Sequence, residues 1–209
     1  MTREKHPIAP EDLRVIPANE ASFEDIETVM GVRGDAATCH CQRFKLQRKE
    51  SFGSLGREEL TARLREQSHC GEPRARTTTG LVAYLDDEPI GGCVVEPRSA
   101  YDGLRRAFRV PWDGRDEDKA DDTVWAVTCF TVRAGYRRRG VSGALAAAAA
   151  SYAKERGARA VEGYPLVVQP GEDITWGELS VGKRSIFDDA GFTEVHAPTK
   201  RRVVMRKDF

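Results

Sequence analysis

Three consecutive arginines followed by two closely spaced glycines form the part of the chain best suited to bind an anion. They lie in the segment Tyr136-Arg137-Arg138-Arg139-Gly140-Val141-Ser142-Gly143. The preceding residues 123–132 are mostly apolar, β-branched or aromatic, which is typical of a strand buried on both faces. The following residues 141–156 are rich in alanine and have apolar side chains at helical spacing. A helix that begins at this turn presents unpaired backbone N–H groups and the positive end of its dipole, so the sequence predicts a phosphate-binding loop.

Two other interpretations of this basic segment are a solvent-exposed turn and a patch that binds nucleic acid. The glycine spacing favours a small phosphate ligand, because the missing side chains of Gly140 and Gly143 let backbone N–H groups approach it closely. The chain has 33 basic and 33 acidic residues, so no overall positive charge attracts a polyanion. We therefore expect no nucleic-acid partner.

The loop resembles the acetyl-coenzyme A signature of one enzyme family. It lacks the GxxxxGK(S/T) and GxGxxG patterns of other phosphate loops and reads Arg137-x-x-Gly140-x-Ser142 instead. This is similar to Gln/Arg-x-x-Gly-x-Gly/Ala, with which GCN5-related N-acetyltransferases hold the pyrophosphate of acetyl-coenzyme A (acetyl-CoA) at a strand–turn–helix junction. Ser142 departs from the usual Gly or Ala but is small. The segment Phe187-Asp188-Asp189-Ala190-Gly191-Phe192 also resembles the family's helix-end pattern, and the resemblance covers residues 79–209.

The resemblance implies the fold, the cosubstrate and the residues that hold it. We expect an α/β (α+β) fold in one domain, residues 1–209, with a central twisted mixed sheet covered by helices on both faces. Acetyl-CoA is the expected cosubstrate, and the expected acceptor is a primary amine of a small molecule or peptide. The backbone N–H of Val132 or of Thr131 is expected to polarise the thioester carbonyl. The residues expected to bind acetyl-CoA lie in the loop and at the end of the strand before it: Thr131, Val132, Arg137, Arg138, Arg139, Gly140, Val141, Ser142 and Gly143.

Hydrophobic periodicity and turn residues predict the order of elements around this loop. Strands are expected at residues 13–16, 80–85, 90–95, 123–132, 158–162, 192–196 and 202–206. Helices are expected after Ser22 and at residues 57–67, 141–156 and 183–190. Residues 33–54 are expected to be helical or looped and residues 170–182 to be a loop. Residues 97–122 form an insertion, and a connection of this length is typical of a functional segment, a disordered segment or a lid.

Transfer of an acetyl group from a thioester to an amine requires a base. An amine resembling that of lysine has a pKa near 10.4, so its deprotonation at pH 7 costs about 4.6 kcal/mol. Many family members carry a Glu on the strand before the loop and a Tyr near the end of the last helix. Here residues 124–132 contain no Glu, and Phe187 replaces the Tyr. We therefore expect Glu162 to be the general base and Tyr164, on the same face of its strand, to be the general acid.

Alternatives to this catalytic pair remain open. In one of them Glu162 ends its strand in solvent, Tyr164 borders the core, and Glu96 or His40 is the base. Catalysis through a water molecule, or without a base for a less basic amine, is another. The departures from the family pattern also favour a second function class, a non-catalytic acyl-CoA-binding module for regulation or interaction. Residues 97–122 and 39–44 are the expected walls of the acceptor site.

The remaining composition indicates a cytoplasmic protein. The N-terminus has no hydrophobic signal, and no apolar run approaches the roughly 18 residues that span a bilayer, so no membrane partner is expected. Five cysteines, an odd number, favour a reducing compartment over a disulfide framework. Cys39, Cys41, His69 and Cys70 lack the spacing of a zinc site, so no metal is expected. The oligomeric state is left open, with a homodimer as one option.

Overall fold

A seven-stranded mixed sheet forms the centre of the molecule. The computed structural model describes residues 6–169 and 171–209. The strand order is β1-β2-β3-β4-β5-β7-β6, in which β4 and β5 are parallel and the other neighbours are antiparallel. The strands are β1 (Leu13–Pro17), β2 (Gly80–Leu85), β3 (Glu88–Pro97), β4 (Val124–Val132), β5 (Ala160–Gly163), β6 (Thr193–Thr199) and β7 (Arg202–Asp208). The expected mixed sheet is thus confirmed.

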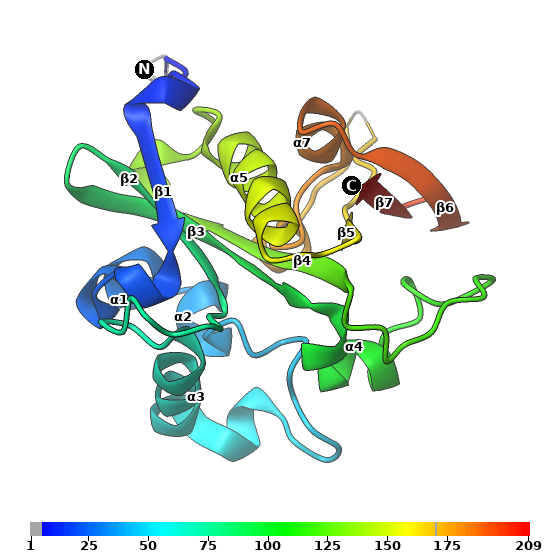
Figure 1. The fold of residues 1–209 in the computed structure, drawn as a ribbon, viewed down its shortest axis with the longest axis horizontal. Coiled ribbons are helices and arrows are strands. Elements are labelled where there is room, and N and C mark those ends of the chain that lie inside the picture. The colour runs from blue at the N-terminus through cyan, green and yellow to red at the C-terminus, as the bar shows by residue number, and fades with distance from the viewer. Residues whose placement is uncertain (1–5, 170) are drawn as a thin grey trace.

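Helices cover both faces of this sheet, as the sequence predicts. α5 and α7 lie on one face, and α1, α2 and α3 lie on the other (Figure 1). In the described part of the chain, no helix is both long and apolar enough to cross a membrane. The helices are α1 (Phe23–Met30), α2 (Asp35–Cys39), α3 (Phe52–Ser68), α4 (Asp102–Ala107), α5 (Val141–Glu155), α6 (Trp176–Leu179) and α7 (Arg184–Asp189), with 3₁₀ turns η1 (Pro10–Asp12), η2 (Ala18–Glu20), η3 (Arg98–Ala100) and η4 (Ala134–Tyr136).

Local sequence signals fix where several helices begin and end. Ser22 caps α1, because its hydroxyl accepts the backbone N–H of Asp25 at 3.1 Å. After α5 and α7 the chain turns at Gly157 (φ +83°) and Gly191 (φ +78°), in the left-handed region that glycine adopts without strain. The expected helix ends at these two glycines are confirmed.

Two hydrophobic layers hold the helices against the sheet. On one face, Leu145 and Ala149 of α5 are buried against strand residues that include Val127. The small alanine side chains let α5 lie close to the strands, which keeps the layer well packed. On the opposite face, Phe23 of α1 is buried in a second layer that includes Val94 of β3. Both faces of the central strands are therefore covered, which explains their nearly continuous apolar sequence.

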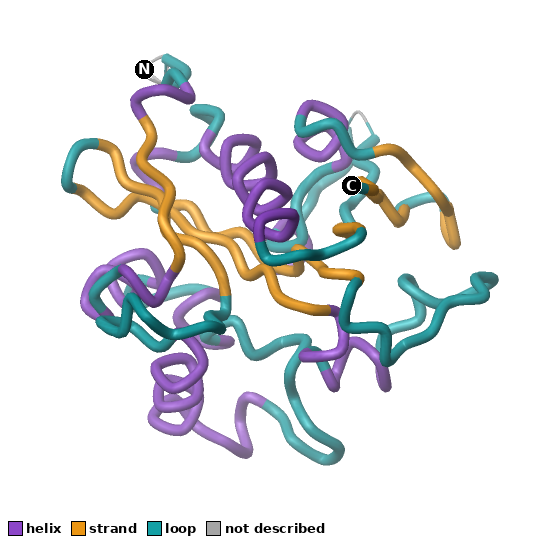
Figure 2. The backbone as a smooth tube through the Cα atoms, viewed as in Figure 1, coloured by secondary structure: helices purple, strands orange, loops and turns teal. Residues whose placement is uncertain are grey.

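Residues 97–122 are packed against the sheet and are not a disordered insertion. Tyr101 is fully buried, and its hydroxyl donates to the carbonyl of Ala126 at 3.2 Å. Trp112 donates its indole N–H to the carbonyl of Leu104 at 3.0 Å. The chain between α4 and β4 then extends toward β6 (Figure 2), where Gly114 faces the ring of His196. This segment therefore belongs to the hydrophobic layer on the side of α1 and α3.

Short helices occur in two segments where the sequence predicts loops or mixed structure. α2 lies within residues 33–54, and α6 lies within residues 170–182. α6 has a reciprocal cap: Glu178 donates its N–H to the Thr175 hydroxyl at 3.3 Å, and its carboxylate accepts the N–H of Thr175 at 3.1 Å. A helix this short has too few residues to show hydrophobic periodicity, which is why the sequence pattern does not reveal it.

Candidate functional site

β4 and β5 separate where their parallel pairing ends. Their register runs from Val124↔Ala160 to Val127↔Gly163, whereas β4 continues to Val132. A side chain at Gly163 would overlap α7, because a Cβ there would lie 2.1 Å from the ring of Phe187. Among the described residues, no strand lies beside the last residues of β4 on the β5 side, and we call this side the open edge of β4.

The open edge carries backbone donors. Phe130 donates its N–H to the carbonyl of Ser180 at 2.6 Å, outside any strand pair. Arg133 instead donates its N–H to β3 at 2.9 Å. Because N–H groups alternate sides along a strand, Val132 directs its N–H to the open edge and Thr131 directs its N–H to β3. Of the two expected donors the geometry thus favours Val132, and Phe130 is a donor that sequence reasoning missed.

The basic loop leads from the end of β4 into the first turn of α5. Gly140 precedes the helix with φ +88°, and Arg138 also lies in the left-handed region with φ +61°. The first bonds of the helix are donated by Gly143 and Ala144, which both reach the carbonyl of Gly140, at 3.0 and 3.1 Å. The N–H groups of the residues before Gly143 therefore point out of the helix end, as an anion site requires.

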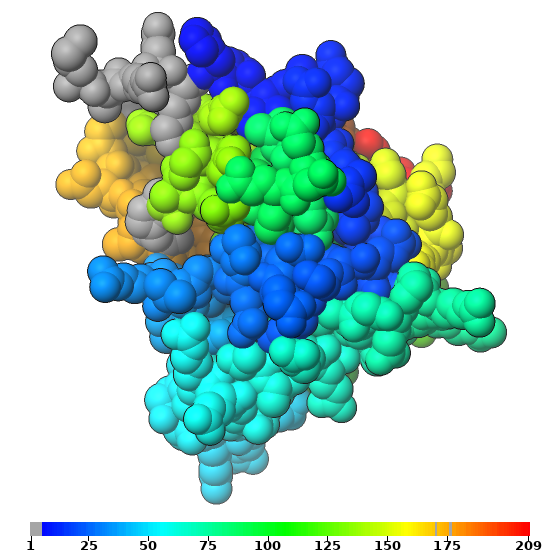
Figure 3. Space-filling view, turned by 90° about the vertical axis from the view of Figure 1, so that its left-hand side faces the viewer, coloured from blue at the N-terminus to red at the C-terminus, as the bar shows by residue number. Residues whose placement is uncertain are grey.

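The three arginines of the loop have different surroundings. Arg137 donates its Nε–H to the carbonyl of Val132 at 2.8 Å, which ties the loop to the end of β4. Arg139 donates its Nε–H to the carbonyl of His6 at 2.9 Å, and Arg138 is exposed. This part of the chain (yellow-green in Figure 3) lies at the surface beside the bright green β2–β3 turn. The loop is therefore anchored by backbone carbonyls and remains open to a ligand.

One row of side chains crosses the sheet on the face covered by α1 and α3. Its members are direct cross-strand neighbours, paired as Glu96↔Ala126, Ala126↔Glu162 and Glu162↔Arg206. Two carboxylates thus flank Ala126 on β4, one on each neighbouring strand. They are the two acidic side chains of this row, and both are paired with cations.

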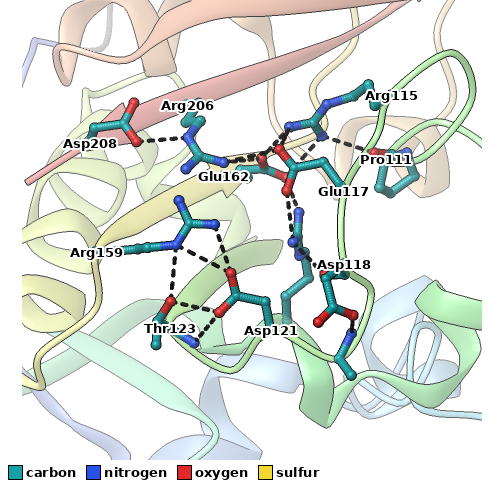
Figure 4. A network of polar contacts seen from close by, with 12 residues as sticks. Pro111, Arg115, Glu117, Asp118, Asp121, Thr123, Arg159, Glu162, Arg206 and Asp208 are labelled. Carbon is teal, nitrogen blue, oxygen red and sulfur yellow. Dashed lines mark hydrogen bonds and ion pairs between the residues drawn. The ribbon is translucent and has the colours of Figure 1, made fainter.

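Glu162 lies at the centre of a buried ion cluster (Figure 4). Three arginines bind its carboxylate: Arg98 at 3.2 Å, Arg115 at 2.6 Å and Arg206 at 3.0 Å. Tyr164 donates its hydroxyl to Glu162 Oε2 at 3.0 Å. The side chains of Glu162 and Arg98 have no exposed surface. Both carboxylate oxygens are therefore engaged inside the protein.

A second carboxylate makes this cluster a network. Glu117, whose side chain is 20% exposed, lies 3.0 Å from Arg98, 3.0 Å from Arg115 and 3.5 Å from Arg206. Three guanidinium groups thus face two carboxylates, and the planar geometry of arginine suits such shared contacts. The cluster joins residues 97–122 to β5 and β7.

These surroundings do not favour Glu162 as a general base. Burial alone would raise the pKa of Glu162, but the hydrogen bond and charge of Arg115, together with the charge of Arg98, lower this pKa below its usual value. A base works best when its pKa lies near the working pH, and this shift is in the opposite direction. Burial raises the pKa of Tyr164 well above its usual range, and the charge of Glu162 adds to this, so the tyrosine stays protonated as a donor to Glu162. The structure thus brings the two predicted residues together as parts of the ion cluster.

Glu96 has a lighter set of partners. Its carboxylate lies 2.5 Å from Lys45 Nζ and accepts the hydroxyl of Thr79 at 2.8 Å. Lys45 also donates to Gln67 at 3.0 Å. The Glu96 side chain is 14% exposed, whereas that of Glu162 is fully enclosed. Glu96 thus has one cation partner and some solvent contact, whereas Glu162 has three cation partners and no solvent contact.

His40, the other alternative base, is enclosed beneath α3. It is 3% exposed, and its Nε2 lies 3.1 Å from the Thr61 hydroxyl. That hydroxyl already donates to the carbonyl of Arg57 at 2.8 Å, so Nε2 is the donor in the contact between His40 and Thr61. Burial lowers the pKa of His40, and the charge of Arg57 lowers it further. His40 is therefore a neutral residue of the protein interior.

The cysteines and histidines of residues 39–70 separate into different places. Cys70 contacts the carbonyl of Ala18 at 3.3 Å, and His69 Nδ1 lies 3.7 Å from Glu72. Cys39 and Cys41 lie instead near Cys129 of β4. Among the described residues, no group of three or more His, Cys, Asp or Glu side chains is arranged to hold a metal ion.

Comparison with known proteins identifies the family. Residues 43–164 match the model of the Acetyltransferase (GNAT) family, and a search of curated proteins finds no match. The GNAT domain of S. lividans PAT has 20% identity and a TM-score of 0.50, over 94% of this chain and 90% of that chain. A second solved structure, an acetyltransferase, has 20% identity and a TM-score of 0.55, over 93% and 98%. These two structures share the fold, the family model spans more than half of the sequence, and the chain belongs to the GNAT acetyltransferase family.

Proposed function

We propose that this protein is an acetyl-CoA-dependent N-acetyltransferase that transfers acetyl to a primary amine of a small molecule or peptide by direct attack. The observation that carries the proposal is the junction between the open edge of β4 and the first turn of α5. Backbone donors at that edge lie next to an anion site formed by residues 137–143. A ligand with a phosphate at one end and a polar extended arm fits this arrangement.

The residues present fit the cosubstrate. The N–H groups of Val141 and Ser142, with the loop arginines, are suited to the pyrophosphate, because the helix end and the guanidinium groups are all positive. The N–H of Val132 is suited to the thioester carbonyl, because a fixed donor polarises the carbonyl group. Acetyl-CoA supplies the acetyl group as an activated thioester. The protein binds this group, orients it and accepts a proton from the incoming amine.

For the proton we propose Glu96 as the acceptor. An amine with a pKa near 10.4 must be deprotonated before it attacks. Glu96 and Glu162 are equivalent in register on either side of Ala126, but three arginines hold Glu162 and one lysine holds Glu96. A carboxylate with one cation partner and some solvent contact is the better site for a proton that must arrive and leave.

Release of free thiol from acetyl-CoA, measured with a panel of small amines and peptides, tests this function. We expect turnover with at least one class of amine, and saturation by acetyl-CoA. Glu96→Gln is expected to lower kcat by about 100-fold and to change the pH profile, since general bases contribute about 10²–10⁴-fold. Glu50→Gln is the matched control, because Glu50 is also paired with a cation, Arg63, but lies outside the site. Equal activity of both variants would remove Glu96 from the mechanism.

A second function, acyl-CoA binding without catalysis, is favoured by one observation. Both carboxylates that flank Ala126 are paired with cations, and the carbonyl of Ser180 occupies the N–H of Phe130. A protein that binds acetyl-CoA but has no free base would act as a regulatory or interaction module. Tight acetyl-CoA binding with no thiol release across the whole panel would favour this function over the first.

The absence of a nucleic-acid partner, the cytoplasmic location and the homodimer stay predictions from the sequence. The neutral balance of charges favours a protein without a nucleic-acid partner. Binding of duplex DNA or RNA that weakens steeply with salt would contradict that expectation. A cytoplasmic location and the homodimer remain predictions for fractionation and light scattering.

A further inference from the structure

Two thiols from distant parts of the chain meet beside the open edge of β4. Cys41 follows α2, and Cys129 lies on β4 next to Phe130. Both line a small cavity of about 30 Å³ on the face covered by α1 and α3. Cys41 is 7% exposed, and its Sγ lies 3.9 Å from Met30 Sδ, whereas Cys129 is half-buried. The acetyl-transfer proposal gives neither thiol a role.

The two thiols influence each other's protonation. The interaction with Cys129 raises the pKa of Cys41, and burial raises it further. The same interaction lowers the pKa of Cys129 against the effect of burial, and Thr131 and Arg43 act in the same direction. The third thiol nearby is Cys39, whose pKa burial raises to about 11. Of these three thiols, Cys129 is the one whose pKa is lowered, and Cys41 lines the same cavity.

We propose that Cys41 and Cys129 form an oxidisable dithiol that a peroxide converts to a disulfide. The cavity they share has room for about one water molecule, and hydrogen peroxide is only slightly larger. This assignment goes beyond the proposed function, because it concerns a covalent modification that requires no acetyl-CoA. It also gives a role to cysteines that have no metal-binding arrangement.

The reaction balances with peroxide as the oxidant. The Cys129 thiolate attacks one peroxide oxygen, the O–O bond breaks, and hydroxide leaves with a proton as water. The product is a sulfenic acid at Cys129. The Cys41 thiol, which lines the same cavity, attacks that sulfur, the S–O bond breaks, and a second water leaves. Two thiols are oxidised by two electrons, and one peroxide is reduced to two waters.

The disulfide would connect the end of α2 to β4 beside the edge that acetyl-CoA is proposed to occupy. Cys129 is adjacent to Phe130, whose N–H faces that edge, and its thiol shares the cavity with Thr131. A covalent link there fixes the segment after α2, which contains the expected wall of the acceptor site. Oxidation is therefore expected to reduce acetyl transfer, and reduction to restore it.

Peptide mapping of the full chain tests the modification directly. The reduced protein is treated with hydrogen peroxide, the remaining thiols are alkylated, and peptides are separated without reductant. We expect one pair of peptides joined through Cys41 and Cys129 that dithiothreitol separates. The proposal is overturned if both thiols are alkylated after the other cysteines have been oxidised, or if the linked pair contains Cys39 in place of either residue.

Single substitutions provide the controls. Cys41→Ser and Cys129→Ser are each expected to remove the linked pair, and agreement between them guards against a folding defect in one. Cys70→Ser is the matched control, because Cys70 is also half-buried but contacts Ala18 and Ser68 outside the cluster. Cys70→Ser should leave the linked pair of peptides unchanged. Loss of the linked pair in this variant would count against the assignment.

A second measurement compares the activity of oxidised and reduced protein, and this arm alone rests on the proposed function. Thiol release by the original chain should fall at least tenfold after oxidation and recover with dithiothreitol. In Cys41→Ser the ratio of oxidised to reduced activity should stay near one. A reduced protein with no turnover would contradict the proposed function but not the dithiol. Full turnover with the disulfide formed would overturn the inhibitory role.

Discussion

Two sets of three arginines lie in this molecule, and their surroundings are opposite. Residues 137–139 are consecutive and lie near the surface just before α5, and Arg137 and Arg139 donate to backbone carbonyls. The second set comes from η3, from the segment before β4 and from β7, and it encloses Glu162. The members of this second set are Arg98, Arg115 and Arg206.

Arginine can therefore serve ligand binding or stability, depending on which groups neutralise its positive charge. In the loop, Arg137 and Arg139 donate to neutral backbone carbonyls and Arg138 is exposed, so we expect this set to serve a ligand. The buried arginines form ion pairs with Glu162 and Glu117, so their charge is neutralised within the protein. Substitutions in the loop should therefore change ligand affinity, and substitutions in the cluster should change the free energy of unfolding.

The largest expected effect is on stability, from Glu162→Gln. Removal of this charge leaves three guanidinium groups, two of them less than a tenth exposed and one fully buried, around a neutral amide. Breaking a buried ion network in this way destabilises a protein by about 3–5 kcal/mol. Urea unfolding measures the loss. Glu117→Gln, at a position that is 20% exposed, is the control and should lose less.

The same variant also separates the two roles considered for Glu162. If it is a structural carboxylate, the folded fraction of Glu162→Gln should bind acetyl-CoA with unchanged affinity and retain turnover. Unchanged stability together with lost turnover would instead restore Glu162 as the general base, and the comparison between the two arginine sets would fail.

The loop is the region whose structure the sequence predicts best. Its conformation depends on residues next to each other: Gly140 supplies the positive φ that begins α5, and Gly157 supplies the one that follows it. The hairpin of β2 and β3 and the helix stop at Gly191 are predicted for the same reason. Short-range patterns of glycine, caps and apolar spacing are visible in a linear sequence.

The cluster could not be predicted in this way, because its contacts are between residues far apart. Glu162 is separated from Arg98, Arg115 and Arg206 by 64, 47 and 44 positions. Charged residues in an insertion usually face solvent, so nothing local shows that Arg98 is buried. The alternation of β5 correctly places Glu162 and Tyr164 on one face, but the protonation of a group depends on its neighbours in space.

The next largest effect is on binding, from the double substitution Arg137→Glu with Gly140→Asp. A negative charge then faces the proposed phosphate site, and an aspartate must adopt φ +88°, which costs about 1–2 kcal/mol. We expect acetyl-CoA affinity to fall by about 100-fold or more, or roughly 3 kcal/mol. Calorimetric titration measures it. Ala147→Glu, on an exposed position of the same helix, is the control. Unchanged acetyl-CoA affinity in the double variant would contradict the assignment of the loop as the phosphate site.

The pH dependence of stability gives a smaller and graded effect. Because the folded state lowers the pKa of Glu162, its stabilisation is fully present above the unfolded pKa of about 4.5. It is lost as pH falls through the lower folded pKa, and each unit of lowering contributes about 1.4 kcal/mol. The difference in unfolding free energy between the original chain and Glu162→Gln should stay constant from pH 7 to about 5 and shrink below 4.5. A difference that grows in acid would contradict the direction of this shift.

The smallest expected effects come from substitution of single loop arginines, and their sizes should differ among Arg137, Arg138 and Arg139. Arg138→Ala should weaken acetyl-CoA binding by about fivefold, or 1 kcal/mol, because an exposed charge is screened by solvent and salt. Its free energy of unfolding should not change. Arg137→Ala should lower affinity and also stability, because its Nε–H holds the carbonyl of Val132 at the end of β4.

Arg139→Ala completes this series, because the Nε–H of Arg139 donates to the carbonyl of His6, at the start of the described chain. We expect the smallest loss of affinity here, measured by the same titration at low and at high salt. The salt dependence of binding should decrease most for Arg138→Ala, since the most exposed charge contributes mainly through long-range attraction. If all three variants instead lost stability and kept affinity, the loop arginines would resemble the buried set, and the proposed division between binding and stability would not hold.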